Sequence, residues 1–295
     1  MRLSGPTFSI NPGQDGSVTR RAVLAGGAAV LAGGTLLRGA PASAAAPKFV
    51  VGANEPWFTR VQAAVPGVSC RRVYYGVYNY IPPSWPTAGT NATQCVSIRP
   101  VPSRLLSGSL DAGLKTFIAS APPGSMLNAW HEAGNLAGYP AYINPANMRA
   151  VHAYMNNLCK GSNVSYGPIL CMHPDKMPPW IVRGLGWYGL DIYDWPEFHF
   201  PHGGPLDIHG LLWPRFDQWK AVIQHVTGQR NPRLDICETN ANDTSHRPKW
   251  MRAVAEWMAA NGGHRMLTYW SQHGVGPWLP QDQATIKALR TCTLL

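Results

Sequence analysis

The chain has few charged residues and lacks the sequence patterns of several large protein classes. Charged residues make up 14% of its 295 positions, whereas disordered chains are usually rich in charge and poor in aromatic residues. No cluster of lysines and arginines interleaved with aromatic residues indicates a nucleic-acid surface. Six cysteines occur without a C-x-x-C pair, which argues against a cysteine-rich zinc site. We therefore expect a globular protein that binds no nucleic acid.

Several catalytic motifs are also missing. The sequence has no G-x-S-x-G elbow of the kind that carries a serine nucleophile. The first expected strand, 48–52, is followed by no glycine-rich phosphate turn, which disfavours an open dinucleotide-binding sheet. The same strand lacks the H-x-H pair of barrel amidohydrolases. The sequence therefore predicts neither an organic cofactor nor a catalytic metal.

One long apolar stretch is present, and it lies near the N-terminus. An arginine pair within Ser17–Leu24 precedes the apolar run Ala22–Leu37, and Ala42-Ser43-Ala44 has the form of a cleavage site. The run has about 16 residues, whereas a membrane span needs roughly 20. Residues 1–44 are therefore predicted to be a twin-arginine-type signal peptide. Residues 45–295 would be one exported, extracellular domain without a membrane span.

Export changes the expected charge and the expected state of the cysteines. Residues 1–44 carry four of the 25 basic and one of the 15 acidic residues, which leaves a mature net charge of +7. Such a charge suits a cell-wall or acidic-polymer environment. An even number of cysteines in an exported protein favours disulfides. Cys159 and Cys171 are close in the chain and are the first expected pair, although six cysteines allow 15 connectivities.

Apolar runs of strand type alternate with segments of helical periodicity along the whole mature chain. An alternation of eight strands and helices over about 250 residues predicts a parallel sheet closed into a barrel. We therefore expect an α/β protein with a single (β/α)8 TIM barrel. The expected strands are 48–52, 72–76, 95–99, 126–132, 168–173, 189–193, 234–239 and 266–271, and the expected helices are 57–65, 104–120, 145–158, 213–226, 248–260 and 281–289.

Two glutamates stand where catalytic groups of a barrel are expected, at the carboxyl ends of strands. Glu132 ends the fourth expected strand and Glu238 the seventh. Glycoside hydrolysis needs two carboxyl groups on opposite sides of one bond. Strand alternation predicts that Trp130 faces the barrel lumen with Glu132, while His131 faces sideways. The other candidate substrate-binding residues are aromatic or basic: Arg99, Trp130, His131, Tyr193, Trp195, Trp270 and His273.

The sequence resembles the retaining clan of (β/α)8-barrel glycoside hydrolases between about residues 125 and 280. An acid/base glutamate on strand four and a nucleophile on strand seven is the layout of that clan. Trp130-His131-Glu132 resembles the His-Glu pair of the β-mannanase-type glycoside hydrolase family 26. Gly189–Tyr193 and Met266–Trp270 are similar to the sixth and last strands of that family.

The resemblance implies a role for each matching residue. Glu132 would be the acid/base and Glu238 the nucleophile. Tyr193 would donate a hydrogen bond to the nucleophile, His131 would polarise the neighbourhood of the acid/base, and Trp270 would form the apolar floor beneath the sugar. The resemblance implies a retaining, endo-acting glycosidase that cleaves mannan- or glucan-like β-linked polysaccharide without a cofactor. With the signal peptide of residues 1–44, we expect this protein to be secreted, and we expect it to be a monomer.

Two other hypotheses remain at this point. A non-catalytic carbohydrate-binding barrel is favoured by Cys237–Asn240, which lacks the glycine expected soon after the nucleophile, and disfavoured by the retained glutamate pair. A metal-dependent hydrolase or lyase would use the histidine-rich loop after the sixth strand. Its candidate ligands are His199, His202 and His209 together with His173 and Asp191.

Overall fold

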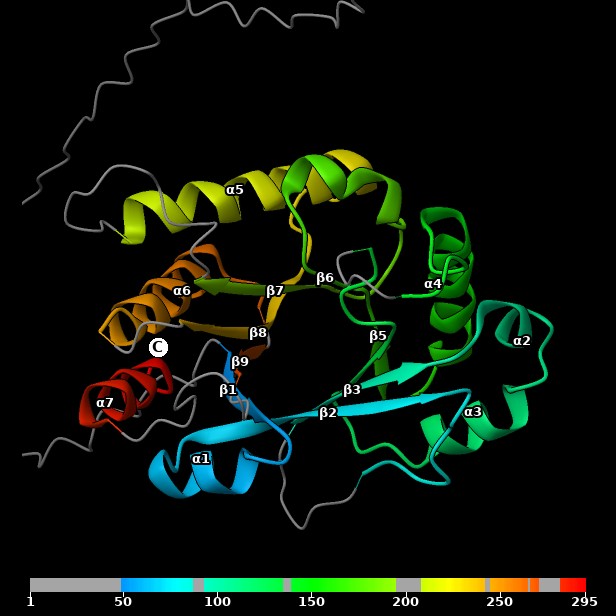
Figure 1. The fold of residues 1–295 in the computed structure, drawn as a ribbon, viewed down its shortest axis with the longest axis horizontal. Helices are drawn as coiled ribbons and strands as arrows, with labels where there is room; N and C mark the ends of the chain where they lie inside the picture. Colours follow the sequence, from blue (N-terminus) through cyan, green and yellow to red (C-terminus); the bar gives the residue numbers. More distant parts are fainter. Residues whose placement is uncertain are drawn as a thin grey trace, which may run out of the picture. The chain divides into compact units, whose positions relative to one another are not determined.

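The sheet of the protein contains nine strands that pair in parallel throughout. A computed structural model describes residues 49–86, 93–134, 139–194, 208–241, 245–264, 266–270 and 282–295 (Figure 1). The sheet order is β5-β4-β3-β2-β1-β9-β8-β7-β6. The strands are β1 (Val50–Asn54), β2 (Val68–Tyr78), β3 (Thr93–Arg99), β4 (Ser125–Ala129), β5 (Val164–Tyr166), β6 (Ile169–Leu170), β7 (Tyr188–Asp194), β8 (Leu234–Ala241) and β9 (Met266–Tyr269).

The two end strands of this order, β5 and β6, together fill one position of a barrel. Only Gly167 and Pro168 separate them. The Gly167 N–H donates to the carbonyl of Leu127 at 3.2 Å, and the Gly189 N–H donates to the carbonyl of Pro168 at 2.8 Å. Hydrogen bonds therefore run from β4 through this segment to β7, and the sheet closes over eight positions. The predicted (β/α)8 barrel is confirmed.

The break between β5 and β6 has a local cause. Pro168 has no N–H to donate to a ladder. A Cβ on Gly167 would lie 2.3 Å from the backbone oxygen of Trp187, so a residue without a side chain is needed there. The predicted fifth strand, 168–173, was misplaced, because pairing begins at Val164 and ends at Leu170.

Helices surround the strands, with α5 along the top of the view in Figure 1, α1 at the bottom, α4 at the right and α6 and α7 at the left. The predicted helix over 104–120 is two helices, because Gly108 adopts a φ of +76° between them. No helix in the described ranges is long and apolar enough to span a membrane. The helices are α1 (Phe58–Ala64), α2 (Pro102–Leu106), α3 (Asp111–Ala119), α4 (Pro145–Cys159), α5 (Ile208–Thr227), α6 (Arg247–Asn261) and α7 (Gln283–Cys292).

The cysteines of the barrel are free thiols. Cys159 ends α4, where the chain enters β5, whereas Cys171 follows β6, where the chain leaves the barrel strand. The two residues therefore lie toward opposite ends of the barrel, and the predicted Cys159–Cys171 disulfide was wrong. Three other cysteines pack in the lower half of the barrel interior, in a cluster that we call the sulfur layer: Cys70, Cys95, Met126, Ile169, Trp187, Cys237 and Met266.

Candidate active site

A bulge in β8 places Glu238 inside the barrel. Leu190 of β7 pairs with Ile236, but the next residue, Asp191, pairs with Glu238, so that Cys237 is one extra residue in β8. Cys237 packs in the sulfur layer, and Glu238 contacts side chains above that layer. In a regular strand neighbouring side chains point to opposite faces. The bulge therefore lets two successive residues face the same interior.

Glu132 is placed by an irregular segment rather than by a strand. β4 ends at Ala129, three residues earlier than predicted. Trp130 and Glu132 have φ values of 63° and 56°, a left-handed conformation that costs free energy for residues with side chains and that occurs often at functional sites. Hydrogen bonds from the Trp130 N–H to Ile98 (3.0 Å) and from the Glu132 N–H to Ile169 (2.9 Å) hold the segment.

This segment reverses the predicted orientation of two side chains. Trp130 is fully buried, and its indole N–H donates to the carbonyl of Pro100 at 2.6 Å. The His131 ring instead lies 5.1 Å from that of Tyr74, which hydrogen-bonds Glu238. The prediction that Trp130 faces the lumen and His131 faces sideways was wrong, because it assumed that strand alternation continues past Ala129.

Three carboxyl groups meet at this end of the barrel. Each of Glu132, Asp191 and Glu238 has a carboxylate oxygen that lies within 4.8 Å of a carboxylate oxygen of the other two. The three residues are 9%, 2% and 3% exposed. The two predicted glutamates are thus brought together from β8 and the segment after β4. A glycosidase that places a water molecule between its carboxyl groups needs a separation of about 6.5–9.5 Å, and one that attacks the sugar directly needs about 5–5.5 Å.

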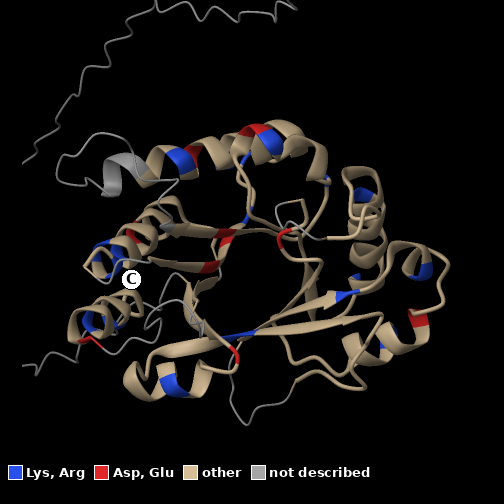
Figure 2. Ribbon diagram, in the orientation of Figure 1, with Lys and Arg blue, Asp and Glu red and all other residues tan. Residues whose placement is uncertain are grey.

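Three side chains hold Glu238. None of them makes a described hydrogen bond to Glu132. The Arg72 Nε atom lies 3.8 Å from a Glu238 carboxylate oxygen. The hydroxyls of Tyr74 and Tyr193 donate to its two oxygens. Figure 2 shows acidic segments on β7 and β8 and basic segments on β2 and at the end of β3. Glu238 is therefore surrounded by groups that stabilise its ionised form.

Arg72 is itself fixed by a chain of polar contacts across the barrel. Its guanidinium donates to Ser97 at 2.7 Å, Ser97 donates to Asn128 at 3.1 Å, and Asn128 donates to the carbonyl of Gly167 at 3.0 Å. Sequence reasoning missed Arg72 and Tyr74 as site residues. The available signal was the pair of arginines, Arg71 and Arg72, inside a strand of mostly apolar and aromatic residues, because a buried charge needs a partner.

The two glutamates hold a proton with different strength because their surroundings differ. Burial, and then the nearby charge of Glu238, raise the pKa of Glu132 to about 7. Burial also raises the pKa of Glu238, but Arg72 and the hydroxyls of Tyr193 and Tyr74 oppose this effect. Two carboxyl groups with different proton affinities at one site are the arrangement by which one acts as an acid while the other stays ionised.

Asp191 is the third carboxyl group of the site. Neither of its oxygens has a hydrogen-bond partner in the described residues. Burial, and then the charges of Glu238 and Glu132, raise its pKa well above the usual range. A neutral Asp191 avoids placing a third negative charge beside the two glutamates. Sequence reasoning considered Asp191 only as a metal ligand.

The remaining predicted substrate-binding residues fall in different places. Trp270 follows β9, and its ring meets Tyr74 edge-on at 5.5 Å. Arg99 ends β3, and its guanidinium donates to the Tyr139 hydroxyl at 3.3 Å. Burial and the charges of Arg72 and Arg99 lower the pKa of His131 well below its usual value, so this ring is neutral at pH 7. Trp195 and His273 lie outside the described residues.

The expected ligands of the metal hypothesis are not brought together in the described part of the chain. His173 is exposed and lies 3.2 Å from Asp175, whereas Asp191 is buried in the barrel. His199 and His202, and the side chain of His209, lie outside what the structure describes. Among the described residues, the three carboxyl groups of the site are the one cluster with metal-ligand spacing.

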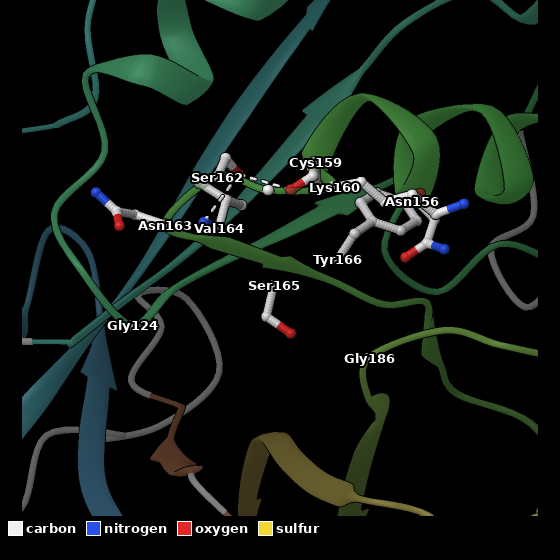
Figure 3. Close-up of a pocket in the computed structure, with 11 residues that line it drawn as sticks. Gly124, Asn156, Cys159, Lys160, Ser162, Asn163, Val164, Ser165, Tyr166 and Gly186 are labelled. Atoms are coloured by element: carbon white, nitrogen blue, oxygen red, sulfur yellow. Dashed lines mark hydrogen bonds between the residues drawn. The ribbon is translucent and has the colours of Figure 1, made fainter.

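A hollow lies at the other end of the barrel, where α4 leads into β5. Its volume is about 370 Å³, and Asn156, Lys160, Ser162 and Tyr166 are among its lining residues (Figure 3). It contains no carboxylate. Barrel active sites form at the carboxyl ends of strands, so this hollow is separate from the candidate active site.

Comparison with known proteins identifies the fold. No protein-family model matches the chain, and no curated protein does. Thermotoga maritima Cel5A, solved with a mannotriose substrate, matches with a TM-score of 0.55 and 10% identity over 82% of this chain and 97% of its own. A GH5_18 protein from Bifidobacterium longum subsp. infantis matches with a TM-score of 0.55 and 11% identity, over 83% and 78% of the two chains.

A third match is the cellulose synthase subunit Z of Clostridioides difficile, with a TM-score of 0.52, 10% identity and coverage of 82% and 99%. The chain therefore has the fold of the (β/α)8-barrel glycoside hydrolases, and the resemblance to that clan is confirmed for the fold. The assignment to family 26 within the clan stays a prediction.

Proposed function

We propose that the protein is a secreted glycoside hydrolase that cleaves β-linked, mannan- or glucan-like polysaccharide with retention of configuration. The observation that carries the proposal is the close approach of Glu132 and Glu238 in surroundings that differ for each. The barrel fold supports it, since barrel glycosidases place such a pair at the carboxyl ends of their strands. One of the matching structures is described with mannotriose as its substrate, and another is described as an endo-β-1,4-glucanase in complex with its substrate.

The first chemical step forms a bond between the sugar and Glu238. The Glu238 carboxylate, oriented by Arg72 and two tyrosines, attacks the anomeric carbon. As the bond between that carbon and the leaving oxygen breaks, Glu132 gives its proton to that oxygen. A pKa of about 7 keeps a large share of Glu132 protonated at neutral pH, as a general acid requires.

The second step returns the enzyme to its first state. The Glu132 carboxylate removes a proton from a water molecule, whose oxygen attacks the same anomeric carbon. The bond to Glu238 breaks, Glu238 regains its negative charge, and Glu132 is protonated again. Two inversions at one carbon give net retention. Tyr74 and Tyr193 stabilise the Glu238 carboxylate at the beginning and at the end of the cycle.

Secretion and endo action are part of the proposal. The arginine pair and apolar run within residues 1–44 support export through the twin-arginine route. Fusion of residues 1–44 to a reporter that is active only after folded export tests this part, with a variant in which Arg20 and Arg21 are replaced by lysine as control. A reporter exported equally well by both forms would contradict it.

Hydrolysis of a polysaccharide panel tests the activity. The panel contains mannans, mixed-linkage and β-1,3-glucans, xylan and actinobacterial wall polymers, with and without EDTA. We expect hydrolysis of a β-linked polymer that EDTA leaves unchanged and that both Glu132→Gln and Glu238→Gln abolish, with rate losses on the order of 10⁴-fold or more.

Each other outcome has a defined meaning. Activity that survives either substitution would contradict the residue assignment. Loss of activity with EDTA would favour the metal-dependent hypothesis. Tight binding without hydrolysis across the panel would favour a carbohydrate-binding barrel. Glu256→Gln, which changes a half-buried glutamate paired with Arg252 on α6, is the matched control and should keep full activity.

A further inference from the structure

Arg99 differs from the other arginines that lie inside or against the barrel. Arg72 lies within 4 Å of Glu238, and Arg233 lies 2.8 Å from Asp235. Arg99 has no carboxylate within that distance among the described residues, and its Nε atom is buried without a hydrogen-bond partner. Its one described polar contact is the Tyr139 hydroxyl at 3.3 Å. A cation in such surroundings has unused capacity to bind an anion.

The position of Arg99 connects it with the acid/base. It is the last residue of β3, and its charge lowers the pKa of both His131 and Glu132. Its guanidinium stacks over the rings of Trp130 and Tyr139, with distances of 5.9 and 5.3 Å to the ring centres. The group is therefore held in one place beside the candidate active site.

An exposed aromatic ring stands next to this cation. β2 continues to Tyr78, which pairs with Arg99 after an irregularity in the ladder. Tyr78 is 46% exposed, and its ring lies 5.4 Å from that of buried Trp130 with an angle of 30° between their planes. Tyr80 is 45% exposed nearby, and its ring lies 5.9 Å from that of Tyr75.

The strand end that carries Tyr78 is fixed by the backbone of β3. The Asn79 N–H donates to the carbonyl of Arg99 at 3.0 Å. The Asn79 side chain accepts a hydrogen bond from the Val101 N–H at 2.8 Å, and Asn79 itself has a φ of 58°. Tyr78 and Arg99 are thus presented together by two anchored strands rather than by a free loop.

We propose that Arg99 and Tyr78 form a subsite for an acidic sugar unit of the substrate, in which a carboxylate binds the guanidinium and the sugar ring packs on the tyrosine. The inference rests on the proposed function and specifies its substrate as a β-linked polysaccharide that contains uronic acid. A guanidinium presents a planar pair of donors that matches the two oxygens of a carboxylate. The positive net charge of the chain also favours the approach of an acidic polymer.

Paired polymers that differ in one group test the subsite. Glucuronoxylan and glucuronomannan are each compared with their carboxyl-reduced forms, in which the carboxylate becomes a hydroxymethyl group. Binding to the inactive Glu238→Gln variant is measured by calorimetry, and hydrolysis by the active enzyme is measured in parallel. We expect at least tenfold tighter binding of one acidic polymer than of its reduced form, with a preference that weakens as salt rises.

The same preference should disappear in Arg99→Met. For hydrolysis of the acidic polymer by this variant, we expect KM to rise about tenfold while kcat changes little, because the lost contact binds substrate and transition state alike. Arg99→Lys should keep part of the preference. Arg60→Met is the control, since Arg60 lies in α1, where it stacks over Trp57, and its substitution should leave both constants unchanged.

Equal binding of the acidic and reduced polymers, or binding of neither acidic polymer, would overturn the inference. So would an equal loss of kcat on both polymers in Arg99→Met, because Arg99 would then act only through His131 or Glu132. Hydrolysis of neutral polymers through the two glutamates without any acidic preference would leave the proposed function intact. If an acidic polymer binds in a way that depends on Arg99 but is not hydrolysed, the subsite would be supported and the proposed function would be contradicted.

Discussion

Two layers of side chains fill the barrel interior from the same strands, and their chemistry differs sharply. In β2, Cys70 belongs to the sulfur layer, whereas Arg72 two residues later contacts Glu238. In β8 the change occurs between neighbours, because the bulge turns both Cys237 and Glu238 inward. The sulfur layer is apolar and fully buried, and the layer above it gathers three carboxyl groups and an arginine.

The comparison shows how a packed interior supports a charged site. Burial is the main cause of the raised pKa of Glu132 and of Asp191, and the sulfur layer closes the site from below. Electrostatic interactions are also stronger in such a medium than in water. The lower layer therefore contributes stability and a dry floor, while the upper layer contributes the polar groups that we propose are catalytic.

Two arginine–carboxylate pairs, one near each layer, test whether the two layers have different functions. Substitution of the arginine in the upper layer should have the largest effect on activity. Arg72→Met should reduce kcat on the order of 10²- to 10³-fold, because Glu238 loses the charge that favours its ionised form. Arg233→Met should reduce activity only a few-fold, although loss of its partner leaves Asp235 buried and should lower stability. Kinetics and thermal unfolding measure both. Equal losses of activity in the two variants would show that the layers are not functionally distinct.

The pH profile sharpens the comparison within the upper layer. With a Glu132 pKa of about 7, kcat/KM should fall above that pH by about tenfold per unit as the acid loses its proton. The acidic limb should move to higher pH in Tyr193→Phe, because a hydrogen bond that lowers the pKa of Glu238 is lost. Rates at pH 5–10 give both limbs. A rate that stays constant up to pH 9 would exclude Glu132 as the acid.

Removal of the Glu132 charge should stabilise the protein at alkaline pH. The folded state holds the Glu132 proton to about pH 7 and the unfolded state only to about 4.5, so this group lowers stability as pH rises through that window. Glu132→Gln should therefore raise the free energy of unfolding at pH 8 by up to about 3 kcal/mol, and by little at pH 4. Denaturant unfolding at both values measures it. A variant less stable than the wild type at pH 8 would contradict the prediction.

Substitution in the sulfur layer should have the smallest effect on activity. Cys95→Ala removes one buried sulfur atom and should cost about 1–3 kcal/mol of stability. Activity per folded molecule should stay within about twofold of the wild type, since this side chain packs in the sulfur layer and makes no described hydrogen bond to the three carboxyl groups. Chemical denaturation and active-site titration give the two quantities. A loss of activity greater than tenfold without loss of stability would place the sulfur layer in the catalytic machinery.

The sequence predicted the barrel because its periodic signals are local and strong. α4 illustrates this, since Asn144 accepts a hydrogen bond from the Asn147 N–H at 3.0 Å and Pro145 follows it, both signals of a helix start. The strand 168–173 was misplaced, because the break at Gly167 depends on its contact with Trp187. Trp187 lies outside the local segment, so no local pattern records this contact.

The site was predicted only in part, for a similar reason. Glu132 and Glu238 could be found because one follows β4 and the other lies in the carboxyl-terminal half of β8, two non-adjacent strands of the barrel. The orientation of Trp130 and His131 could not, since it depends on left-handed backbone conformations held by Ile98 and Ile169. Arg72 was missed because its partner lies more than 160 positions along the chain, and no local pattern records that contact.

The configuration of the first product tests the central claim most directly. Hydrolysis of the best β-linked substrate of the panel is followed by proton nuclear magnetic resonance, which records the newly formed reducing end before it equilibrates. Carboxyl groups as close as Glu132 and Glu238 predict that the β-anomer appears first. Appearance of the α-anomer first would show inversion, and would contradict the assignment of Glu238 as the group that bonds to the sugar.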